Sequence, residues 1–184
     1  MKTKLKDIVK ITSGLFSQTH SGAEIYYLMA RDFDNNFHLK QNIEPRISDS
    51  EKLNKHLLTN GDILFAAKGN NFFAAVFEGE VSPAVASSVF LVLRLKNGIE
   101  PHFIAWYLNH PETQKLLWNL STGSSIPSIN KSSLAEVEIP IPDVEIQQKI
   151  VQFEKLRLKE KEIKVELNKL QEELLNYQLL NIVN

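Results

Sequence analysis

The chain has 184 residues, 43% of them hydrophobic, which is enough for one ordinary core and suits one domain with an appendage better than two domains. Residues 1–142 contain 14 basic and 14 acidic residues and the net charge is −1, so the strong positive field of a free-standing nucleic-acid binder is missing. The absence of cysteine excludes disulfides, thiolate metal sites and a cysteine nucleophile. The sequence shows neither a signal-peptide pattern nor 18 consecutive apolar residues, so we expect a cytoplasmic protein without a membrane span.

Short apolar runs predict strands in the first hundred residues. Leu5–Ile11 fits a short helix or a strand, and Ile25–Met29 is strand-like within a long polar stretch. Ile63–Ala67 follows a Gly-Asp turn and is typical of a buried strand. Phe72–Phe77 and Ser87–Leu95 predict two more strands, the second apolar on both faces and therefore covered on both sides.

Helical patterns follow. Pro101 and Pro111 occupy first-turn positions of two helices, which we expect to form an αα-hairpin packed on the sheet. Residues 122–130 are rich in Gly, Ser and Pro and predict a loop. Val137–Ile141 predicts a last strand, which two prolines restrict to a sheet edge or to its exit.

The last forty residues predict one long helix with Asp143 as its N-cap. Its a and d positions from Phe153 to Tyr177 are apolar except Glu160, while charged residues fill most of the remaining surface. A stripe that recurs every 3.5 residues favours a partner helix. We therefore predict a homodimer interface formed by Phe153, Leu156, Ile163, Leu167, Leu170, Leu174 and Tyr177.

The order of elements predicts an α+β fold. Residues 1–142 form a mixed globular domain, and residues 143–184 form one long C-terminal coiled-coil helix. A protein-binding adaptor with a coiled-coil rod and no direct DNA contact also fits this architecture.

Six segments together resemble the target recognition domain and helical spacer of type I restriction-modification DNA specificity subunits. Their order along nearly the whole chain carries the resemblance, because no single segment is diagnostic. The segments are Leu5–Gly14, Gly61–Gly69, Ala86–Arg94, Phe103–Asn109, Gly123–Asn130 and Leu134–Ile150.

The resemblance implies a DNA-reading subunit that holds a separate adenine methyltransferase subunit and, in a full system, a translocating nuclease subunit. Such subunits usually carry two recognition domains and two spacers, whereas this chain has one of each and looks like a half-subunit. The antiparallel pairing of two spacers is also implied by the family. The sequence lacks motifs for methyl transfer, a phosphate loop and a zinc helix, so we expect no catalysis, no metal and no cofactor.

Polar loop residues are the candidates for contact with double-stranded DNA. Lys can donate to guanine and Asn can pair with adenine, so Lys68, Asn70 and Asn71 fit base reading, although Gly-Asn-Asn also fits a plain turn. Arg94 could pair with a buried acid or face a phosphate. The aromatic pairs Phe72-Phe73 and Trp106-Tyr107 are interpreted as core.

Two further groups complete the candidates. Ser124, Ser125, Asn130 and Lys131 belong to a loop that could reach DNA, although Asn130 also fits a helix cap. Gln18, His20 and Arg31 lie in the long polar N-terminal stretch, where plain surface is the alternative.

Overall fold

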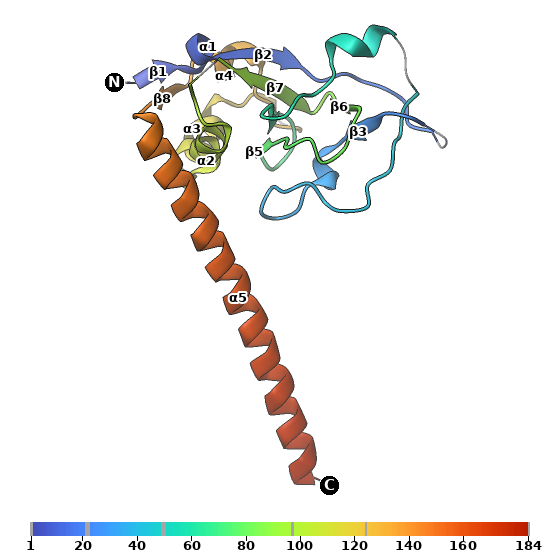
Figure 1. Cartoon of the computed structure of the whole chain (residues 1–184), viewed down its shortest axis with the longest axis vertical. Coiled ribbons are helices and arrows are strands. Elements are labelled where there is room, and N and C mark those ends of the chain that lie inside the picture. Colours follow the sequence, from blue (N-terminus) through green and yellow to red (C-terminus); the bar gives the residue numbers. More distant parts are fainter. Residues whose placement is uncertain (1, 21–22, 49–50, 97, 124, 184) are drawn as a thin grey trace. The chain divides into compact units, whose positions relative to one another are not determined.

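The computed structural model describes residues 2–20, 23–48, 51–96, 98–123 and 125–183 (Figure 1). The chain divides into two compact units, Met1–Gln148 and Lys149–Asn184. The first turn of α5 (Val144–Val183) belongs to the first unit, because the buried Gln147 side chain accepts from the Glu100 N–H at 2.9 Å and donates to the Pro142 carbonyl at 2.7 Å. The predicted α+β class with a long C-terminal helix is confirmed.

The centre of the first unit is a four-stranded antiparallel sheet with the order β2-β7-β4-β5. Its strands are β2 (Val9–Ser13), β4 (Ile63–Ala66), β5 (Phe73–Val76) and β7 (Phe90–Leu95). Phe65 of β4 lies opposite Leu91, and all four residues of β4 are buried. The apolar runs of the sequence therefore form the inner strands and one edge of this sheet.

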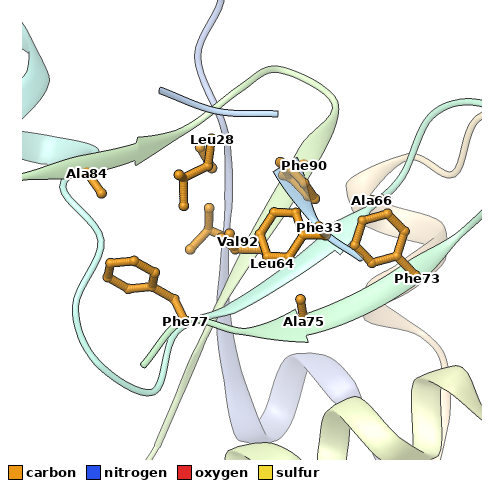
Figure 2. Packing of buried hydrophobic residues seen from close by; sticks show 11 residues of the cluster. Leu28, Phe33, Leu64, Ala66, Phe73, Ala75, Phe77, Ala84, Phe90 and Val92 are labelled. Atoms are coloured by element: carbon orange, nitrogen blue, oxygen red, sulfur yellow. The ribbon is translucent and has the colours of Figure 1, made fainter. Parts of the chain in front are cut away.

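One face of the sheet packs against the N-terminal polar stretch (Figure 2). Phe33 and Phe37 contact Phe73, with ring centroids 5.7 Å and 5.1 Å apart. The parallel pair β3 (Tyr26–Leu28) and β6 (Ala84–Ala86) adds Leu28, Ala84 and Ala86 to the same cluster. The described part of the polar stretch therefore packs on the sheet, and it includes the short helices η1 (Ala30–Asp32) and η2 (Glu51–Lys55).

The helices follow the predicted hairpin. α2 (Pro101–Asn109) and α3 (Pro111–Leu120) each begin with proline, and α2 packs against β5. The Asn109 carboxamide accepts from the Ala74 N–H and donates to the Ala74 carbonyl, both at 2.8 Å. This side chain therefore satisfies the outer backbone groups of edge strand β5, which an open edge would leave free.

Two predicted segments differ in detail from the structure. Leu5–Ile11 divides into α1 (Leu5–Ile8) and the start of β2, because β1 (Lys2–Lys4) pairs with β8 (Glu138–Pro140) and the chain must turn before reaching β7. The prediction of one strand over Ser87–Leu95 is wrong in its first part. The Phe90 N–H donates to the Ser87 carbonyl at 2.9 Å, and this turn separates β6 from β7.

The second unit consists of the remaining residues of α5, which has 40 residues in all. The predicted interface side chains are exposed, from 51% for Leu167 to 70% for Phe153. Across the described part of the chain, helices are too short or too polar to span a membrane.

Candidate nucleic-acid interface

Two polar loops are joined by backbone hydrogen bonds, and we call them the paired loops. They are the β4–β5 loop, residues 67–72, and the loop between α3 and α4 (Lys131–Ala135), residues 121–130. The Gly69 N–H donates to the Pro127 carbonyl at 3.0 Å, and the Ile129 N–H donates to the Ala67 carbonyl at 2.8 Å. Candidates that lie far apart in the sequence thus occupy one surface.

Backbone hydrogen bonds join the two ends of the second loop. Thr122 and Ser128 exchange two of them, of 2.9 Å and 2.8 Å. Gly123 has φ of 102°, and a Cβ there would lie 2.7 Å from the Ile126 carbonyl oxygen, so a larger residue would distort the loop.

Aromatic packing anchors the paired loops at their base. Phe72 is 1% exposed and its ring lies 4.9 Å from that of Trp118, at the end of α3. Phe72 and Phe73 are core residues, as predicted, whereas Trp106 and Tyr107 are only half-buried. Polar loop side chains on such a rigid base are typical of binding sites.

Lys68, Asn70 and Asn71 are exposed at the tip of the first loop. Lys68 forms no ion pair with any residue that the structure describes, so its ammonium group is available to an external acceptor. Ammonium and carboxamide groups provide the donors and acceptors that read guanine and adenine in the major groove.

The second loop contributes fewer free groups. Ser125 and Lys131 are exposed, and Ser124 lies outside the described residues. The Asn130 side-chain oxygen accepts from the Ser133 N–H at 2.8 Å and from the Ser132 hydroxyl at 2.6 Å. Asn130 therefore caps α4, and a bidentate contact with adenine would require breaking this cap.

Gln18, His20 and Arg31 are exposed residues of the N-terminal stretch. The His20 ring lies 2.6 Å from the Ser48 hydroxyl, and the Arg31 carbonyl accepts from the Lys40 ammonium group at 2.7 Å. Among the described residues, no hydrogen bond joins these three to the paired loops. The hydrogen bonds that hold the paired loops together therefore do not include them.

Ile126 was not among the predicted site residues. It is 67% exposed between Ser125 and Pro127, at the tip of the second loop. An apolar side chain there can contact a thymine methyl group, which polar neighbours cannot do as well. The signal in the sequence is one isoleucine in a loop otherwise made of small and polar residues.

Of the two alternatives for Arg94, the structure shows the pairing with a buried acid. Asp62 is 1% exposed and accepts from Arg94 Nε at 2.7 Å and from Arg94 Nη2 at 2.5 Å. The hydrogen bond to Asp62 raises the pKa of Arg94 above its ordinary value. Asp62 also accepts from the Thr59 N–H at 2.8 Å, so the pair holds the turn before β4.

The described side chains contain no group of three or more histidines and acids arranged to hold a metal ion. The Arg46 guanidinium, which lies near the N-terminal candidates, pairs with the buried Asp32 through contacts of 2.5 Å and 2.9 Å. The exposed polar side chains of the paired loops can form hydrogen bonds to a partner that binds at the surface.

A family model and two relatives all name type I restriction specificity proteins. Residues 1–173 match the family model of the type I restriction modification DNA specificity domain. The type I restriction enzyme MjaIX specificity subunit of Methanocaldococcus jannaschii is 25% identical over 156 residues, covering 80% of this chain and 35% of the relative. The putative MjaX specificity subunit of the same organism is 29% identical over 108 residues, covering 56% of this chain and 25% of that protein.

Solved structures show the same fold. The type I restriction-modification S subunit from M. genitalium superimposes with a TM-score of 0.59 at 14% identity, over 83% of this chain and 37% of that one. The HsdS subunit from Thermoanaerobacter tengcongensis gives 0.59 at 19% identity, over 86% and 37%. The chain spans about a third of the length of these relatives. It belongs to the type I restriction modification DNA specificity domain family.

Proposed function

We propose that this chain is the DNA-reading half-subunit of a type I restriction-modification system. Residues 1–142 read one half of a split DNA target, and residues 143–184 form the coiled-coil spacer through which two copies pair. The dimer positions a methyltransferase subunit, and in a full system a restriction subunit, on double-stranded DNA in the cytoplasm. The chain itself is non-catalytic in this proposal, and the partner subunits supply the chemistry.

The paired loops are the observation that carries the DNA-reading proposal. They place exposed Lys68, Asn70 and Asn71 beside exposed Ser125 on one rigid base. The family match over residues 1–173 includes both loops. The net charge of −1 fits an interface in which this chain supplies a few donors to base edges and a partner chain supplies much of the positive charge.

The exposed a/d stripe of α5 supports the homodimer. Leu156, Ile163 and Leu174 are 64%, 55% and 57% exposed, and residues of this size rarely remain open to water in a regular row. A second copy offers an identical stripe, so a two-fold pair buries both.

Exposed apolar side chains outside the a/d stripe support the methyltransferase contact. Val165, Leu179 and Ile182 are 63%, 51% and 80% exposed. At about 100° per residue, Val165 lies about 160° and Leu179 about 120° from Leu167 around the helix, so a pair formed through the a/d stripe leaves these two side chains uncovered. We assign this second face to a helix of the methyltransferase subunit.

The test is a duplex-binding assay with the full chain, with and without its methyltransferase subunit. Binding that needs both proteins and weakens as salt rises supports the proposal, because phosphate contacts release counterions. An assembly that forms but binds no duplex at any salt concentration points to the adaptor function instead.

A further inference from the structure

A basic groove runs along edge strand β2 on the sheet face to which Arg94 projects. The cations that line it, Lys10, Lys55 and Arg94, come from three separate segments, and His56 lies beside Lys55. Hydroxyl groups from Thr12 and Ser13 also line it. We call this feature the β2 groove; it lies within the first unit and shares no residue with the paired loops.

Arg94 is held in place at one end of the β2 groove. Buried Asp62 binds two of its nitrogens, Nε and Nη2, and Nη2 also donates to the Leu57 carbonyl at 3.2 Å. The side chain is nevertheless 49% exposed, and Nη1 has no hydrogen-bond partner among the described residues. A guanidinium that is already fixed loses little freedom when its open edge binds an oxyanion.

The like charges near Arg94 destabilise the folded chain. Lys10 lies directly opposite Arg94 on the neighbouring antiparallel strand, where like charges destabilise the pair. Neither Lys10 nor Lys55 forms an ion pair with a residue in the part of the chain that the structure describes. Asp62, the acid nearest to Arg94, is already occupied by it. An external anion would relieve this repulsion.

We propose that the β2 groove binds the phosphate backbone of the same DNA whose bases the paired loops read, an assignment that rests on the proposed function. Asp62, which binds Arg94, precedes the four-residue strand β4, and Lys68 follows it, so the six residue steps between them span at most roughly 20 Å. At about 3.4 Å per nucleotide, this distance is about six nucleotides along one strand. The groove therefore supplies a sequence-independent contact that fixes the register of the loops.

The test compares two double variants of the full chain in complex with its methyltransferase subunit. Lys10→Ala with Lys55→Ala removes two groove charges, and Lys2→Ala with Lys115→Ala removes two exposed charges elsewhere as the matched control. Affinity is measured from low to high salt on a labelled duplex carrying the methylation motif and on a scrambled duplex. We expect the groove variant to lose roughly 1.8 from the slope of log affinity against log salt on both duplexes, about 0.9 for each lost phosphate contact.

The preference for the motif over the scrambled duplex should stay unchanged in the groove variant. A slope equal to that of the control overturns the proposal, and so does a change in motif preference with an unchanged slope. Weaker assembly with the methyltransferase subunit at an unchanged slope would assign the groove to a protein partner instead. If the unmodified complex binds no duplex, the proposed function fails and this assignment fails with it.

Discussion

At the scale of single residues, Lys68 and Asn71 are expected to set the recognised sequence. Both are exposed on a loop whose backbone is held by its neighbour, so truncation removes base contacts with little effect on folding. Lys68→Ala and Asn71→Ala should each change the methylated motif, while the melting temperature falls by no more than a few degrees. The control is Asn35→Ala, an exposed asparagine in a turn of the N-terminal stretch. An unchanged motif in both loop variants would contradict the assignment.

Glu136 is expected to make stability depend on acid pH. Hydrogen bonds from Lys4, at 2.7 Å, and Lys6, at 2.5 Å, lower the pKa of Glu136 from 4.5 to about 2. Because the folded pKa is the lower one, the stabilisation is present above the unfolded value and is lost as the pH falls through the folded value. Glu136→Gln should therefore melt below the unmodified chain at neutral pH, and the difference should shrink between pH 4.5 and pH 2. A difference that is undiminished at pH 2, or equal in Glu138→Gln, would contradict this.

The sequence predicted the individual candidates better than their arrangement. The sequence allowed two roles for Asn130, a DNA contact or a helix cap. The capping role depends on the residue three positions further along the chain. The bonds between Gly69 and Pro127, and between Ala67 and Ile129, join segments about sixty residues apart, and no local pattern specifies such a pairing. The β2 groove was missed for the same reason, since its cations come from three separate segments.

At the scale of elements, α5 is expected to drive dimer formation through its a/d stripe. Leu167→Asp with Leu170→Asp places charges in the seam and should halve the mass measured by light scattering. The matched control, Glu162→Asp with Lys169→Asp, changes two exposed c positions and should leave the dimer intact. Equal masses for the two variants would contradict dimer formation through the a/d stripe.

The face of α5 that carries Val165 and Leu179 should separate dimer formation from assembly. Val165→Asp with Leu179→Asp should keep the dimer mass and lose copurification of the methyltransferase subunit, because these residues lie away from the seam. Loss of the dimer in this variant would mean that this face belongs to the pairing surface. Retention of the methyltransferase would mean that its contact lies elsewhere.

Elements with a strong local period were predicted well, and the shorter ones were not. The 3.5-residue repeat predicted the long helix, which the structure shows as Val144–Val183. β1 and β6 have three residues each, too few for a pattern, and each pairs with a segment far away in the chain. Their partners, β8 and β3, define them more than their own residues do.

At the scale of the whole molecule, the helix is expected to act as a ruler. Its 40 residues extend about 60 Å at 1.5 Å per residue, and half-sites centred about 34–36 Å apart keep both domains of a dimer on one face of the duplex. Deleting residues 161–167, one heptad, shortens the helix by roughly 10 Å. The preferred spacer between half-sites should change or methylation should cease, and the half-site sequence should stay the same. A deletion variant with an unchanged spacer would contradict the ruler.

The symmetry of the methylated sequence tests the account most directly. Two identical domains related by a two-fold axis must read the same half-site on opposite strands. Methylome sequencing of a strain in which this chain is the only specificity subunit should therefore reveal a split palindrome, with identical half-sites in opposite orientation around a fixed spacer. A contiguous motif, or two unrelated halves, would contradict the model of a symmetric half-subunit dimer.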